Sequence, residues 1–295
     1  MIRKYFARLL FAVSAVLFLT VTCTKDPPKE DPPKEHVITM TTMASKVRID
    51  VWITLSAGND SLAVDWGDGN ISYIDSASFS SLYPSTNRVG FSFSHNYSGA
   101  SEHHITIIAN NIYMLDCSKN QLTNLDVSGN TTLISLKCKI NPLTTLDLSN
   151  CTALENLNAN DCSLTALDVS TNTALTDLYV RYNQFTILNV SKNKKLRRLD
   201  CIGNKLTKLD FKNNTELRIL ACGNNLLTAT AINDMFRTLP NRTDDLYGVG
   251  MDVYGNPGAY DCDYSIAEKK GWMRRHIGPS NMEDRSNSIK IINIK

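Results

Sequence analysis

The sequence lacks an excess of charge of either sign. It contains 31 lysine and arginine residues and 29 aspartate and glutamate residues. Arg3, Lys4 and Arg8 lie in a predicted signal peptide, so the mature chain keeps 28 of those basic residues against 29 acidic ones. A balance this close to zero excludes the overall basic footprint of a nucleic-acid-binding protein and a polybasic membrane patch. We therefore expect no nucleic-acid partner.

The sequence also lacks the short motifs of common enzymes. It has no Gly-x-Ser-x-Gly, no His-Glu-x-x-His and no cysteine and histidine in a plausible catalytic setting. The five histidines, at 36, 95, 103, 104 and 276, do not have metal-ligand spacing. We expect a protein without enzymatic activity, cofactor or bound metal.

An apolar run of membrane-spanning length is missing at the start of the chain. Residues 9–19 are apolar and follow three basic residues, which is typical of an export signal over residues 1–22. Cys23 at the break favours a bacterial lipoprotein whose first residue carries lipid, although a soluble secreted protein and an uncleaved anchor remain alternatives. Residues 23–35 repeat Asp-Pro-Pro-Lys-Glu twice, which predicts an extended tether.

What the sequence has is a 21-residue repeat over residues 111–228. Identical apolar columns at this spacing form a continuous core when the turns stack at about 4.8 Å. Alternation such as Leu136-Lys137-Cys138 predicts one short strand per turn in a parallel sheet, and the absence of a 3.6-residue stripe predicts turns on the back. An asparagine column after the strand is predicted to bond buried backbone groups at the bend. The columns are Leu115, Leu136, Leu157, Leu178, Leu199 and Leu220, then Cys117, Cys138, Ala159, Val180, Cys201 and Cys222, then Asn120, Asn141, Cys162, Asn183, Asn204 and Asn225.

This repeat resembles the leucine-rich repeat family, whose pattern L-x-x-L-x-L-x-x-N-x-L is matched by Leu133, Leu136, Cys138, Asn141 and Leu143. The short period and the recurring Leu-Asp-Val-Ser-x-Asn-Thr look most like the bacterial, internalin-like branch and Bacteroidetes repeat proteins. The resemblance implies a curved right-handed solenoid that binds a partner on its concave sheet, without specifying the ligand.

The segments on either side of the repeat have different patterns. Residues 36–110 contain several short alternating strands, which predict a small sandwich. Within it, Trp66-Gly67-Asp68-Gly69 and the His95-x-Tyr97 pair resemble polycystic-kidney-disease-type immunoglobulin-like domains. Residues 229–295 are predicted to form an α+β cap, with a helix at 229–239, a strand at 245–254, a short helix at 264–270 and a final strand or tail at 289–293. The fold is therefore expected to be mainly β.

The cysteines are predicted to be mostly core residues. Four of the eight occupy the inward column that Ala159 and Val180 also fill, and stacked neighbours there have a poor geometry for disulfides. The pairing of Cys151, Cys162 and Cys262 stays open.

Outward positions of the concave strands are the candidate binding residues, because the repeat leaves them free to vary. A tyrosine and arginines beside carboxylates suit protein hot spots and sugar faces alike, while an ordinary solvated sheet face is the alternative. The candidates are Lys137, Lys139, Asn158, Asn160, Asp177, Tyr179, Arg181, Arg198 and Asp200, with Ser135 and Asn156 beside them.

Two acidic groups have a metal-binding alternative. A column of aspartates could form a calcium ladder, but carboxylates in this setting more often bond turn amides. It consists of Asp126, Asp147, Asp168 and Asp210. Asp65, Asp68 and Asn70 could form a metal loop or a hairpin turn.

The hypothesis that combines these features is a monomeric adhesion lipoprotein, anchored by lipid in the outer membrane and displayed at the cell surface, that binds a protein ligand. The alternatives are a glycan-binding accessory of a nutrient uptake system and a structural envelope protein.

Overall fold

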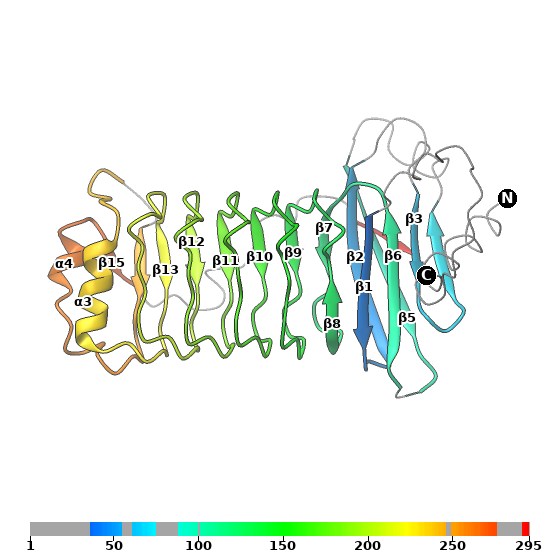
Figure 1. Cartoon of the computed structure of the whole chain (residues 1–295), viewed down its shortest axis with the longest axis horizontal. Coiled ribbons are helices and arrows are strands. Elements are labelled where there is room, and N and C mark those ends of the chain that lie inside the picture. Colours follow the sequence, from blue (N-terminus) through cyan, green and yellow to red (C-terminus); the bar gives the residue numbers. More distant parts are fainter. Residues whose placement is uncertain are drawn as a thin grey trace, which may run out of the picture. The chain divides into compact units, whose positions relative to one another are not determined.

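The computed structural model describes residues 36–54, 61–74, 88–99, 101–245, 249–275 and 291–294, all within one compact unit, Glu35–Lys295 (Figure 1). The predicted signal peptide, Cys23 and the tether lie outside the described residues. Within the described ranges, no helix combines the length and the apolar character needed to cross a bilayer.

The first part of this unit is a two-layered β-structure, as its alternating strands predict. The strands are β1 (His36–Thr42), β2 (Lys46–Thr54), β3 (Leu62–Asp65), β4 (Ile71–Ile74), β5 (Arg88–Asn96), β6 (His103–Ala109), β7 (Ile112–Asp116) and β8 (Leu122–Asp126). One sheet has the order β4-β3-β6-β1-β8, and β7, β2 and β5 belong to a second sheet. Ile49, Phe93 and Ile105 are fully buried in the core, because every second side chain of a strand points to the same face.

The first turn of the repeat contributes a strand to each of these sheets. β7 pairs with β2 on one side, antiparallel, and with the solenoid strand β9 on the other, parallel. β8 pairs antiparallel with β1. Asn120 strengthens this junction, since its Oδ1 accepts the Arg48 N–H at 3.0 Å and its Nδ2 donates to the Arg48 carbonyl at 2.6 Å. The boundary expected at residue 110 therefore falls within continuous sheets.

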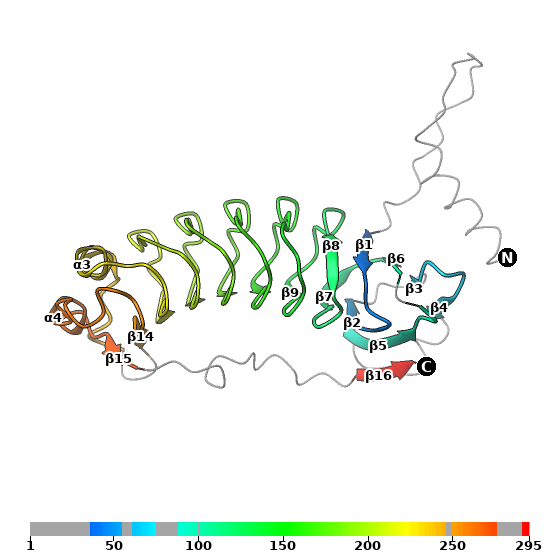
Figure 2. The same ribbon diagram turned by 90° about the horizontal axis from the view of Figure 1, so that it is seen from below.

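The repeat itself forms the predicted stack of parallel strands (Figure 2). These are β9 (Ser135–Lys137), β10 (Asn156–Asn158), β11 (Asp177–Tyr179), β12 (Arg198–Asp200) and β13 (Ile219–Ala221). They pair in register, so that Leu136, Leu157 and Leu178 stand side by side. These leucines are fully buried, which confirms a mainly β, leucine-rich repeat solenoid.

The structure adds a seventh turn that the sequence analysis missed. β14 (Gly250–Asp252) pairs in parallel with β13, with Met251 beside Leu220. Asn256 takes the place of the asparagine column in this turn. Its Nδ2 donates to the Cys222 carbonyl at 2.9 Å, and its Oδ1 accepts the Leu227 N–H at 3.1 Å.

Helix α3 (Ala229–Thr238) is inserted before this seventh turn. It begins after Thr228, whose side chain accepts the Ala231 N–H, and it buries Ile232, Met235 and Phe236. α4 (Ser265–Glu268) is shorter than expected, and β15 (Met273–Arg274) adds a last short strand to β14. The indole N–H of buried Trp272 donates to the Pro240 carbonyl at 2.9 Å, which fastens the cap to the end of α3.

The final strand does not belong to the cap, contrary to expectation. β16 (Ile291–Ile294) pairs in parallel with β5. It therefore lies at the opposite end of the 11-stranded sheet from β15 (Figure 2). This pairing joins segments about 200 residues apart, and nothing in the local pattern of residues 289–293 specifies it.

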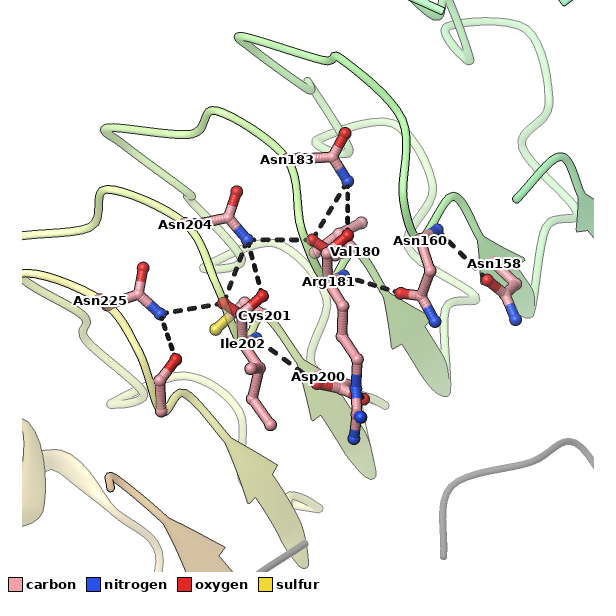
Figure 3. Close-up of polar contacts among 11 residues, drawn as sticks. Asn158, Asn160, Val180, Arg181, Asn183, Asp200, Cys201, Ile202, Asn204 and Asn225 are labelled. Atoms are coloured by element: carbon pink, nitrogen blue, oxygen red, sulfur yellow. Dashed lines mark hydrogen bonds and ion pairs between the residues drawn. The ribbon is translucent and has the colours of Figure 1, made fainter. Parts of the chain in front are cut away.

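Two asparagine ladders hold the bends of the turns. On the strand side, the ladder amides of Asn141, Asn183, Asn204 and Asn225 bond backbone of their own turn and of the preceding one, as predicted; part of this ladder is drawn in Figure 3. Asn204, for example, donates to the Val180 carbonyl at 3.0 Å and accepts the Phe185 N–H at 3.1 Å. The second ladder, on the back, was not predicted, although its members also recur every 21 residues. It comprises Asn130, Asn172, Asn193 and Asn214, all fully buried, with Cys151 in the remaining place.

Cys162 interrupts the strand-side ladder and gives a stability prediction. An asparagine Oδ1 accepts the N–H of the equivalent residue in other turns, whereas the Leu143 N–H has no such acceptor among the described residues. Cys162→Asn is expected to supply that bond and to raise the free energy of unfolding by about 1 kcal/mol. Urea unfolding would measure the change, with Cys162→Ala as the control. A Cys162→Asn protein no more stable than Cys162→Ala would contradict the role given to the ladder oxygen.

Candidate binding surface

The concave sheet brings all nine predicted binding residues onto adjacent turns. Lys137 lies on β9, Asn158 on β10, Asp177 and Tyr179 on β11, and Arg198 and Asp200 on β12. Asp177 is in register with Arg198, and Tyr179 with Asp200. Lys139, Asn160 and Arg181 each stand two residues beyond the strand of their turn.

Most of these residues are buried, although they occupy outward positions of the concave strands. Lys137, Asp177, Tyr179, Arg181 and Asp200 are buried, and only Arg198 of the nine is exposed. Turns separated by about 4.8 Å place long side chains against one another, so charged groups pair laterally between turns. The repeat pattern predicts the positions of these residues on the sheet. It does not predict that their side chains are buried.

Two ion pairs connect β11 with β12. The Arg198 guanidinium lies 2.8 Å from Asp177, whose carboxylate also accepts bonds from the hydroxyls of Thr176 at 2.7 Å and Tyr179 at 3.3 Å. The Arg181 guanidinium pairs with Asp200, and both side chains are buried (Figure 3). Because the second pair is buried, removing either partner would leave an uncompensated charge.

The two asparagines of the predicted set bond backbone. Asn160 Oδ1 accepts the Arg181 N–H at 2.7 Å, and Asn158 Oδ1 accepts the Asn160 N–H at 3.2 Å (Figure 3). Both amides therefore support the bends between turns, which limits their freedom to contact a ligand.

Burial raises the pKa of Asp200 to about 6, although the neighbouring Arg181 opposes the shift. The folded protein then binds this proton more tightly than the unfolded chain. The contribution of Asp200 to stability is full below about pH 4 and is lost as the pH rises through about 6.

Asp200→Asn would test this pH dependence. Between pH 4 and 7 the stability of the wild-type protein relative to Asp200→Asn should fall by up to about 3 kcal/mol. Urea unfolding of both proteins at several pH values would measure it. The unpaired Arg181 adds a constant offset only, so parallel pH profiles would contradict the shift.

A groove lies along the edge of the concave sheet where strands β11 to β13 begin. It has a volume of about 660 Å³ and is lined by Thr176, Asp177, Arg197, Arg198, Glu216, Arg218, Ile219 and Arg242. Arg197 lies 3.1 Å from Glu216, and Arg218 lies 2.9 Å from Asp245. The sequence analysis missed Arg197 and Arg218, although their 21-residue spacing places them side by side at the edge.

A second hollow of about 570 Å³ lies at the cap. Met251, Tyr254, Tyr264 and Arg274 are among its lining residues. The Arg274 guanidinium stacks 4.2 Å from the centre of the Tyr264 ring, and exposed Tyr254 meets exposed Tyr260 edge to face at 6.3 Å. Exposed aromatic rings of this kind offer flat apolar faces to a ligand.

The acidic groups with a metal alternative bond backbone instead. Each aspartate of the column accepts the N–H two residues later, at 2.8 or 2.9 Å, which confirms the turn role. Bonds from Ser149 lower the pKa of Asp147, and bonds from Ser170 lower that of Asp168. Asp65 and Asp68 likewise accept N–H groups within the β3–β4 hairpin. No cluster of three or more potential metal ligands occurs in the part of the chain that the structure describes.

The cysteines pack as expected in the core. Cys117, Cys138, Cys201 and Cys222 are fully buried in the inward column, where burial raises the pKa of the Cys201 and Cys222 thiols. Cys151, Cys162 and Cys262 are also buried, and none of these seven forms a disulfide in the described structure.

The fold is a leucine-rich repeat solenoid with short, helix-poor turns. No protein-family model and no curated protein matches the chain. Solved structures similar to it include the functional domain of InlJ from Listeria monocytogenes, which includes a cysteine ladder. That domain is 27% identical, with a TM-score of 0.30, and the match covers 55% of this chain and 49% of that one. The internalin InlF from L. monocytogenes strain 4b F2365 is 18% identical, with a TM-score of 0.42 and coverage of 56% and 48%. The chain thus spans about half the length of each structure.

Proposed function

We propose that this protein is a non-enzymatic, cell-surface binding protein that recognises a protein ligand along the edge of its concave sheet. The groove carries the proposal, because it combines arginines with carboxylates beside a rigid sheet. Arginine is enriched at protein hot spots, where its planar group forms paired hydrogen bonds with carboxylates.

The exposed pair of Arg197 and Glu216 is well suited to contact a ligand. Their side chains are 60% and 44% exposed. Solvent-exposed ion pairs add little to stability, so exchanging this pair for contacts with a ligand costs little. The buried pair of Arg181 and Asp200, by contrast, holds the surface in shape.

The proposed location rests on the sequence. A signal peptide over residues 1–22 and lipid on Cys23 would anchor the protein in the outer membrane, with residues 23–35 as the tether. Protease treatment of intact cells tests display: complete protection of the region from residue 36 onward would rule it out. Cys23→Ala should release the protein from the membrane fraction.

Arg197→Ala combined with Glu216→Ala tests the groove, because the two residues form an exposed ion pair that lines it. Because both side chains are exposed, the double variant should keep its melting temperature and lose at least about tenfold in affinity for any protein ligand found by screening extracellular proteins. The matched control is Arg237→Ala with Asp234→Ala, which removes an exposed ion pair elsewhere. Equal affinity of the groove variant and this control would exclude the groove.

Glycan binding at the cap is the second candidate, favoured by the exposed tyrosines Tyr254 and Tyr260. Sugar rings stack on such faces. In a parallel glycan screen, Tyr260→Ala should abolish any hit while the groove variant retains it. The opposite pattern would assign the hit to the groove.

A further inference from the structure

The near-neutral balance of the whole chain hides a segregation of charge along the solenoid. Residues 111–180 contain three lysines, no arginine and seven acidic residues. Residues 181–220 contain ten lysines and arginines but three acidic residues. Two successive turns therefore form a strongly basic band next to an acidic stretch.

Within the band, a group of exposed lysines lies on the segments that precede β12 and β13. This lysine patch comprises Lys192, Lys194, Lys195 and Lys212, all exposed. None of the four makes an ion pair within the described ranges. Glu216, one repeat after Lys195, is paired with Arg197 at 3.1 Å, and the Asp210 carboxylate accepts the Lys212 N–H at 2.8 Å. The ammonium groups are thus available to an external anion.

The backbone beneath the patch is fixed by the ladder on the back of the solenoid. Asn193, between Lys192 and Lys194, is fully buried, and its Nδ2 donates to the Val169 carbonyl at 3.0 Å and the Asn172 carbonyl at 2.9 Å. The approach segments of successive turns are also bonded, since the Arg218 N–H donates to the Arg197 carbonyl at 2.9 Å. The lysines are therefore attached to a backbone that hydrogen bonds hold in place. This lowers the entropic cost of ordering that backbone when a ligand binds.

We propose that the lysine patch binds a linear anionic polysaccharide, carrying sulfate or carboxylate groups. Flexible ammonium groups act as point charges and suit anions dispersed along a chain. Clusters rich in basic residues, such as Ser-Lys-Asn-Lys-Lys at residues 191–195, are typical of heparin and nucleic-acid sites. Residues 191–198 and 212–218 contain no aromatic side chain on which bases could stack, which favours the polysaccharide.

This inference is independent of the groove and of its protein ligand. The patch lies on the segments that precede the strands, and it uses lysines that do not line the groove. A polysaccharide on the patch and a protein in the groove would be distinct partners.

Heparin is the probe for the patch. The protein without its predicted signal peptide should bind heparin at the physiological ionic strength of about 0.15 M. Lys192→Gln, Lys194→Gln and Lys195→Gln combined should weaken binding at least about tenfold and reduce the slope of log affinity against log salt by about two. The melting temperature should not change, because all three side chains are exposed.

The control removes the same charge elsewhere, by Lys46→Gln, Lys119→Gln and Lys269→Gln. It should bind heparin like the wild-type protein. An equal loss in both triple variants, or no heparin binding by the wild type, would overturn the proposal. Single-stranded DNA bound as tightly as heparin, with the same loss in the patch variant, would also overturn it in favour of a nucleic-acid site.

Discussion

The structure depends on satisfying buried backbone groups each time the chain bends into the next turn. Leucines at a 21-residue spacing give the stacked turns a core, but a bend inside that core leaves N–H and carbonyl groups without water. The ladder asparagines bond these groups in their own turn and in the preceding one. The residue before the ladder position adopts a left-handed conformation in successive turns, with φ of 58° at Ile140 and 49° at Tyr182. The amide bonds offset the cost of that conformation.

The same close stacking determines where the surface remains available. On the concave sheet, charges on adjacent turns are near enough to pair, so Arg181 and Asp200 contribute to the structure itself. Charged groups become exposed at the sheet edge and on the segments that approach it, where Arg197 and the lysine patch lie. The charged side chains at the centre of the concave sheet therefore stabilise the stacked turns. The charged side chains at its edge are the ones that a partner can contact.

The regular part of the fold could be predicted because its cause is local and repeated. The leucine column, the asparagine ladder and the buried face of α3 all follow from spacing. The seventh turn could not be recognised by period, because α3 separates Asn225 from Asn256 by 31 residues. The ladder on the back was missed because Cys151 interrupts it and asparagine is common in turns. The burial of Asp200 and the pairing of β16 with β5 depend on distant segments, which no local pattern specifies.

The two ends of the 11-stranded sheet also limit how copies of this protein can meet. β15 contributes only Met273 and Arg274 at one end, both exposed, and at the other end β16 pairs with residues 90–93 of β5. Edge strands as short as β15 and β16 are poor templates for adding a strand from another molecule. Growth of fibres by end-to-end joining of solenoids is therefore disfavoured.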